Sequence, residues 1–216
     1  MPTLRFEQNL LYMLYLYWML NLLILVIIIV VVFTSLSMHI ENRSTEVDYV
    51  VSGYDQQKYV VRNLPDKEHA AHLLSLIKTQ LIKLVEHLTR TYPKDPRVKR
   101  LQENFDPDRI SEASPTGTYT SYSVNKGEKI VFCLRQRDQH ENLLDLNTMI
   151  FVAIHEIAHI MTESVGHTPE FWENMKFLLN VAMSNDLQIY QYHPYHERPQ
   201  SYCGTVISDT PLKIKS

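Results

Sequence analysis

The chain contains 216 residues, which is enough for one folded domain and an additional segment. Charged residues make up 21% and hydrophobic residues 45%, a balance that is ordinary for a folded protein. The formal net charge of −3 at pH 7 indicates no general attraction to nucleic acid, and five glycines are too few for a flexible or repetitive chain.

The first predicted element is an uncharged apolar tract over residues 10–33, interrupted only by Asn21. It is long enough to span a bilayer with some tilt, and its aromatic residues gather in the first half, as expected near a membrane interface. A cleaved signal peptide fits less well, because the tract is long for one and no A-x-A site follows. We therefore expect a single-pass membrane protein with a lipid bilayer as partner, residues 1–9 as a short tail and 34–46 as a polar linker.

The orientation of this segment in the membrane is only weakly indicated. Arg5 and the amino terminus flank one end, whereas Arg43 flanks the other end among acidic residues. Because the positive residues nearly balance, the positive-inside rule leans only slightly toward a cytoplasmic amino terminus with the domain across the membrane.

Residues 47–216 are expected to form one domain. Two strands are predicted over 47–51 and 59–62, and a long amphipathic helix over 67–91, with Asp66 as its N-cap. The histidines of this helix fit solvated or boundary positions better than a metal site; they are His69, His72 and His87.

A short helix over 96–104 is predicted to begin at Asp95-Pro96. The stretch 90–100 around its start is rich in Lys and Arg, so it could contact the phosphates of lipid or DNA. Such a run is more often only a solvated face, and nucleic acid is therefore a weakly supported partner.

Two further strands, 119–124 and 129–134, flank a predicted hairpin turn at 125–128. Cys133 lies in the second of these strands, and Cys203 lies near the carboxyl end. Two interpretations stay open for this pair: free thiols, or one disulfide that ties the tail to the sheet in an oxidising compartment.

The segment 143–163 is predicted to be a buried helix, because it is apolar on nearly every side. It contains His155-Glu156-Ile157-Ala158-His159, an HExxH pattern expected by chance only about 0.03 times in a chain of this composition. Histidines four residues apart project from one helix face and can bind one Zn²⁺ ion, with Glu156 placed as general base. The alternative is a pair of hydrogen-bonded core histidines.

A hydrolytic zinc site needs a third protein ligand and one open position. Gly166 is a helix stop signal and His167 follows it, while Thr168-Pro169 predicts the start of another helix over 169–184. We therefore predict His167 as the third ligand. Glu163 and Glu170 are weaker candidates for that role.

The segments HEIAHI and GHTPEFW, with the preceding VNKGEKIVFCLR, resemble the WLM/SprT-like zinc metallopeptidases. The resemblance implies peptide-bond hydrolysis, Zn²⁺ as cofactor, His155, His159 and His167 as ligands, and Glu156 as the catalytic acid/base. It implies an α+β fold: a small zincin-like domain with a mainly antiparallel sheet packed on the active-site helix, here preceded by one transmembrane helix. It also implies that strand 129–134 or its neighbour holds the substrate backbone.

The predicted function is membrane-anchored, zinc-dependent hydrolysis of a protein or peptide substrate. Zinc lowers the pKa of its water ligand, and Glu156 takes the proton and passes it to the leaving amine. One alternative is a catalytically silent, zinc-stabilised binding module, although a purely structural site would need no base. Another is a DNA-associated protease of the WLM/SprT type.

The tail after residue 189 offers two further candidate groups. His193 and His196 could form a second metal site, although histidines at this spacing around a proline usually lie on the surface. A tail tyrosine is a candidate to reach the site and donate a hydrogen bond to an oxyanion, and the sequence leaves four open: Tyr190, Tyr192, Tyr195 and Tyr202.

Overall fold

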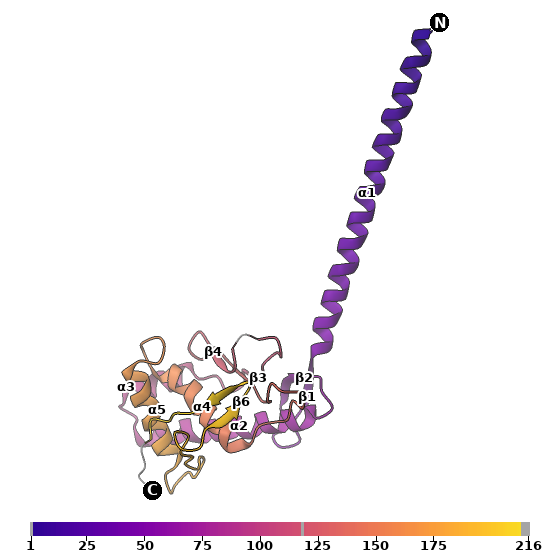
Figure 1. Ribbon diagram of the computed structural model, residues 1–216. Coiled ribbons are helices and arrows are strands. Elements are labelled where there is room, and N and C mark those ends of the chain that lie inside the picture. The colour runs from indigo at the N-terminus through magenta and orange to yellow at the C-terminus, as the bar shows by residue number, and fades with distance from the viewer. Residues whose placement is uncertain (1, 118, 213–216) are drawn as a thin grey trace. The chain divides into compact units, whose positions relative to one another are not determined.

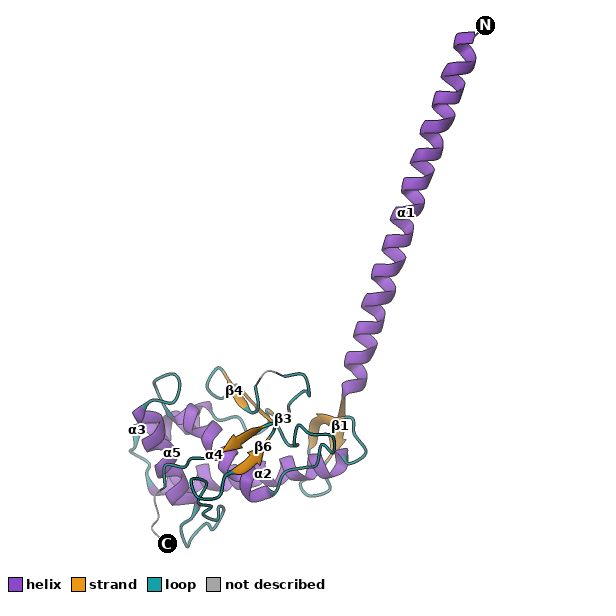
Figure 2. Cartoon of the chain, viewed as in Figure 1, coloured by secondary structure: helices purple, strands orange, loops and turns teal. Residues whose placement is uncertain are grey.

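The computed structural model describes residues 2–117 and 119–212. The chain divides between Glu46 and Val47 into two compact units, an amino-terminal helix and a domain. Figure 1 shows the course of the chain within each unit, and Figure 2 shows its helices and strands.

The first unit is a single helix, α1 (Pro2–Glu46). Residues 34–46, expected as a polar linker, continue this helix instead. Its segment Met13–Met38 has 26 residues with a mean hydropathy of 3.0, and none of its most apolar window is buried. At about 1.5 Å per residue the segment is longer than the roughly 30 Å of a hydrocarbon core, so its length and composition suffice to cross a membrane.

The domain is α+β, as predicted, and contains a five-stranded sheet in the order β1-β2-β3-β5-β4. The strands are β1 (Val47–Val51), β2 (Lys58–Arg62), β3 (Ile110–Glu112), β4 (Tyr122–Val124) and β5 (Lys129–Phe132). The outer pairs β1–β2 and β4–β5 are antiparallel and contain most of the paired residues of the sheet, whereas β3 pairs in parallel with β2 and β5. The strand β4 therefore lies at one edge of the sheet.

Four helices complete the domain: α2 (Lys67–Thr91), α3 (Pro96–Asn104), α4 (Leu146–Met161) and α5 (Pro169–Ala182). Helix α4 contacts the other three helices and also β4. This central position explains why α4 is apolar on nearly every side, since twelve of its residues are buried. The helix that carries the HExxH pattern is therefore held rigidly between the helical layer and the edge strand.

The helix starts follow the predicted caps with one exception. The Asp95 and Thr168 side chains accept hydrogen bonds from the first turns of α3 and α5. Asp66, predicted to cap α2, makes no such bond, because its carboxylate accepts from Arg135 Nη1 at 2.6 Å. The Arg135 side chain is 3% exposed and also pairs with Glu112, and a buried guanidinium without carboxylates would be far more costly than an uncapped helix.

The basic stretch around α3 has partners inside the domain. Arg97 donates to Asp95 and to the Asn174 side chain, and Arg100 Nη1 donates to the Met161 carbonyl at 2.9 Å. These contacts explain part of the charge run through packing between α3 and its neighbours. Binding of phosphate groups by residues 90–100 stays a prediction.

The carboxyl-terminal tail forms a second, two-stranded sheet from β6 (Gln200–Tyr202) and β7 (Thr205–Ile207). Its turn places Cys203 and Gly204 at positive φ, and a disulfide joins Cys203 to Cys133 just beyond β5. The two cysteines therefore form a disulfide and are not free thiols, which decides between the two interpretations of the pair. The tail hairpin is thereby tied to the main sheet.

Candidate metal centre

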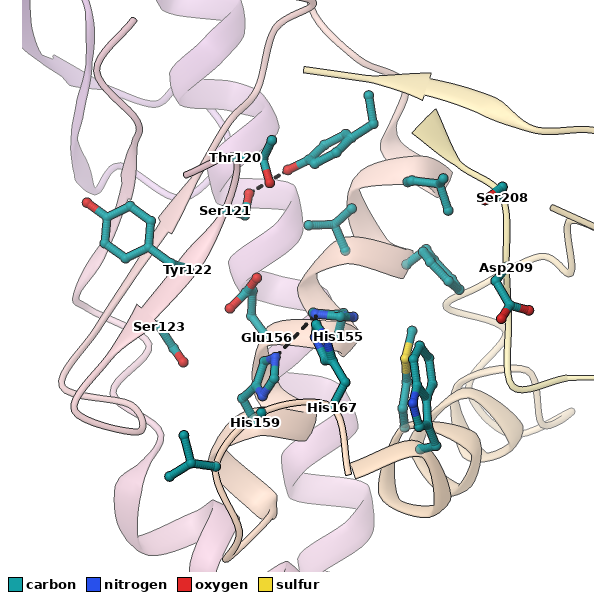
Figure 3. Close-up of a pocket in the computed structure, with 18 of the residues that line it drawn as sticks. Thr120, Ser121, Tyr122, Ser123, His155, Glu156, His159, His167, Ser208 and Asp209 are labelled. Carbon is teal, nitrogen blue, oxygen red and sulfur yellow. Dashed lines mark hydrogen bonds between the residues drawn. The ribbon is translucent and has the colours of Figure 1, made fainter. Parts of the chain in front are cut away.

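Three histidine side chains converge at the carboxyl-terminal half of α4 (Figure 3). His155 and His159 project from the same face of the helix, and His167 approaches from the loop that follows. The Nε2 atom of His155 lies 3.2 Å from Nε2 of His159 and 3.1 Å from Nε2 of His167. The candidate ligand atoms of all three lie within 4.8 Å of one another.

This arrangement fits a cation better than it fits hydrogen bonds between imidazoles. One imidazole nitrogen either carries a proton or offers one lone pair, so His155 Nε2 cannot form a good hydrogen bond to both neighbours. Two nitrogens about 2.0–2.1 Å from a tetrahedral zinc ion would lie about 3.3 Å apart, close to the two observed separations. The residues present therefore fit a zinc ion with three nitrogen ligands.

The electrostatic surroundings keep the two helical histidines neutral. Burial, with smaller contributions from the neighbouring His159 and His167, lowers the pKa of His155 to about 3. Burial likewise lowers the pKa of His159 to about 4. Neutral imidazole is the form that binds metal ions, so both side chains are ready ligands at neutral pH.

Glu156 lies beside the histidines and is 4% exposed. Burial raises the pKa of Glu156 to about 8, and a hydrogen bond from the backbone of Ser123 opposes that rise. Ser123 belongs to the edge strand β4, so the carboxylate faces the sheet edge as well as the metal ligands. A carboxylate with a raised pKa, in a cavity, is suited to accept and release a proton.

Helix α4 ends at Met161, earlier than Gly166, which was predicted to stop it. Gly166 lies in the following loop with φ +85°, a conformation that favours glycine, and it allows the chain to turn so that His167 comes back toward α4. The loop from Thr162 to Thr168 is therefore the element that places the third histidine.

This loop is fastened from both sides. The Lys126 ammonium, in the β4–β5 turn, donates to the carbonyls of Thr162, Glu163 and Ser164, with the first at 2.8 Å. On the other side, the Glu170 carboxylate accepts from the backbone N–H groups of Glu163 and Ser164 and from the Ser164 hydroxyl. The position of His167 is thus supported by one side chain from a distant turn, Lys126, and by one from the first turn of the following helix, Glu170.

A cavity of about 630 Å³ opens over the site. One side is formed by residues 120–123 along the edge strand, and another by the tail hairpin and the residues after it. Apolar side chains line much of the remainder, namely Phe151, Val152, Val165, Trp172, Met175, Val206 and Ile207. The cavity is large enough to hold a short stretch of extended peptide.

Other predicted candidates lie outside the cluster. Glu163 pairs with Arg100 on the surface, and Glu170 supports the loop as described above. His193 Nε2 contacts the Arg198 carbonyl at 2.8 Å. Within residues 2–117 and 119–212, His155, His159 and His167 form the single group of three or more side chains arranged to hold a metal ion.

The structure separates the four tail tyrosines. Tyr190 and Tyr195 pack against Phe151 with tilted rings and are buried in the core, and Tyr192 packs at its margin. Tyr202 alone among the four lines the cavity. Neither Lys126 nor Ser121 was predicted to be a site residue, because a lone lysine in a turn and a serine within a predicted strand carry no local signal.

Comparisons with known proteins agree with the motif. A family model of the WLM domain matches residues 54–210. An uncharacterized protein of Acanthamoeba polyphaga mimivirus is 36% identical over 174 residues, which cover 78% of this chain and 86% of that protein. An uncharacterized protein of Invertebrate iridescent virus 6 is 38% identical over 65 residues, or 30% of this chain and 36% of that protein.

Among solved structures, the crystal structure of Wss1 from Saccharomyces cerevisiae aligns with a TM-score of 0.40 and 20% identity. The alignment covers 54% of this chain and 78% of that chain. The family match over most of the domain confirms the resemblance drawn from HEIAHI and GHTPEFW, and the chain belongs to the WLM family.

Proposed function

We propose that this chain is a membrane-anchored, zinc-dependent metallopeptidase. The observation that carries the proposal is the convergence of three imidazole nitrogens beside the buried carboxylate of Glu156, at the floor of an open cavity. A structural zinc site would fill all four coordination positions with protein ligands, whereas three histidines beside a cavity leave one position for water or substrate.

Each residue has a distinct role in this proposal. His155, His159 and His167 hold the ion, which supplies Lewis acidity and a water of lowered pKa when bound. Glu156 accepts the proton of the attacking water and delivers it to the leaving amine. Lys126 and Glu170 take no part in the reaction and hold the loop that carries His167.

The substrate is a polypeptide in extended conformation. Strand β4 pairs with β5 on one side and lies at the end of the sheet order, so no other strand among the described residues pairs with its outer side, where an extended peptide could be added. The same segment lines the cavity through Ser121, Tyr122 and Ser123. A peptide added alongside β4 would run past Glu156 and the histidines.

The proposal is tested by two variants of the full-length protein in detergent. Glu156→Gln should keep stoichiometric zinc and lose at least about 10²-fold in cleavage of casein or a fluorogenic peptide, since proton transfer contributes about that much. His155→Ala should lose both zinc and activity. Zinc is measured by elemental analysis, and the proposal fails if purified wild-type protein retains no zinc or if Glu156→Gln is fully active.

A further inference from the structure

The tail tyrosine that lines the cavity is anchored at both its backbone and its hydroxyl. Tyr202 is 4% exposed and lies at the end of β6, next to Cys203. The disulfide fixes the backbone of this segment to Cys133 beyond β5. The Tyr202 hydroxyl lies 2.5 Å from the hydroxyl of Ser121, which precedes β4 and is labelled in Figure 3.

Ser121 is itself fixed by the main sheet. Its Oγ accepts a hydrogen bond from the Cys133 backbone N–H at 3.0 Å. The disulfide and this hydrogen bond both originate at Cys133, so one residue directly after β5 holds both the backbone next to Tyr202 and the partner of its hydroxyl. A tyrosine held in this way costs little reorganisation when it engages a ligand.

A count of hydroxyl hydrogens shows what the pair can offer. Between them, Ser121 and Tyr202 have two hydroxyl hydrogens, and only one is used in the bond that joins them. If Ser121 donates to Tyr202, the phenolic hydrogen is left to donate elsewhere. Both residues line the cavity that contains Glu156 and the histidines, so this remaining hydrogen is available to a ligand there.

We propose that Tyr202 is a catalytic residue whose hydroxyl donates a hydrogen bond to the carbonyl oxygen of the scissile peptide. This inference rests on the proposed peptidase function and adds a second stabilising group for the charge that the oxygen gains during attack. No proton is transferred by Tyr202. The attacking water loses its proton to Glu156, the carbon–nitrogen bond breaks, and the amine receives that proton.

The protonation state of Tyr202 supports this role. Burial raises the pKa of Tyr202 above its ordinary value; the hydrogen bond with Ser121 lowers it, and the nearby Glu156 carboxylate raises it further. The phenol is therefore protonated, and able to donate, throughout the neutral range.

The test compares Tyr202→Phe with the matched variant Tyr195→Phe, which removes a hydroxyl from a buried tail tyrosine that does not line the cavity. Tyr202→Phe should lower kcat on the order of 10²-fold, as removal of one oxyanion donor does, with KM and zinc content within about twofold of wild type. Tyr195→Phe should leave kcat within about twofold. Ser121→Ala should lower kcat less than Tyr202→Phe does.

A second readout does not depend on turnover. A phosphinic peptide mimics the tetrahedral carbon with its charged oxygens, so calorimetry should show it bound on the order of 10²-fold more weakly by Tyr202→Phe than by wild type. Unchanged kcat and unchanged phosphinate binding in that variant would overturn the role of Tyr202 and leave the proposed peptidase function intact. If wild-type protein with bound zinc cleaves no peptide, the proposed function and the inference fall together.

Discussion

At the scale of single residues, the site depends on side chains that combine burial with a specific partner. His155, His159 and Glu156 are held by α4, whose surroundings are almost entirely apolar. Their pKa values move in the direction that burial dictates, toward the neutral form of each group. Glu170 shows the opposite behaviour, because backbone donors stabilise its charge.

Glu170 should make the stability of the protein dependent on pH in the acid range. Hydrogen bonds from the backbone of Glu163 and from the side chain and backbone of Ser164 lower its pKa from 4.5 to about 2. A carboxyl whose pKa is lower in the folded state contributes stability that is complete above about pH 4.5 and lost as the pH falls toward 2. We expect Glu170→Gln to lower Tm at pH 7, with a difference from wild type that shrinks between about pH 5 and pH 2.

The measurement is thermal unfolding of full-length protein in detergent across this pH range. Glu173→Gln is the control, because Glu173 is an exposed glutamate on the same helix. A constant difference in Tm between wild type and Glu170→Gln from pH 7 to pH 2 would contradict the assignment.

At the scale of elements, the third histidine is positioned by a turn that is distant in sequence. Lys126 reaches Thr162 across 36 residues and meets three successive carbonyls just beyond the end of α4. A cation there is also favoured by the negative end of the helix dipole. The turn is itself tightly placed, since a Cβ on Gly127 would lie 2.2 Å from the Asn104 carbonyl oxygen.

Lys126→Ala should therefore weaken metal binding without removing a ligand. The loop carbonyls would lose the ammonium group that donates hydrogen bonds to them. We expect zinc affinity to fall on the order of 10-fold, as when other residues that support metal ligands are removed. Competition with a chromophoric chelator measures the affinity. Lys126→Arg should recover part of it, and Lys129→Ala, at an exposed position on β5, should match wild type. Equal affinities for Lys126→Ala and Lys129→Ala would exclude this role.

Periodicity and capping residues predicted the four helices of the domain, because these signals are local, although Asp66 does not cap α2 as expected. Helices α2 and α3 begin and end where expected. The three histidines that the spacing predicted as one group, His155, His159 and His167, lie together in the structure. The contacts of Lys126 and the choice of Tyr202 were not predictable, since each depends on how distant segments pack. The three-residue strands β3, β6 and β7 are too short to show a period of two.

At the scale of the whole molecule, the helix α1 and the disulfide both bear on where the protein resides in the cell. The segment Met13–Met38 is long and apolar enough to cross a bilayer, and structural disulfides persist mainly in oxidising compartments. The disulfide agrees with the slight charge asymmetry around the tract, which favours a cytoplasmic amino terminus. We propose that the domain lies on the side of the membrane opposite the cytoplasm.

This topology has a direct test in sealed membrane vesicles with the cytoplasmic face outward. Added protease should leave the domain intact until detergent opens the vesicles, and the full-length protein should stay with the membrane pellet after alkaline carbonate washing. A variant lacking residues 1–38 should lose this membrane retention. Complete digestion of the domain before detergent is added would reverse the proposed orientation.

The disulfide has one more consequence, which concerns what a proteolytic cut would do. Cys133 and Cys203 are separated by 70 positions, and the covalent ring that they close contains His155, Glu156, His159 and His167. A nick in any backbone bond within that ring leaves the two pieces joined through sulfur. A cut there would leave the two pieces together on a non-reducing denaturing gel, and a reductant would be needed to separate them.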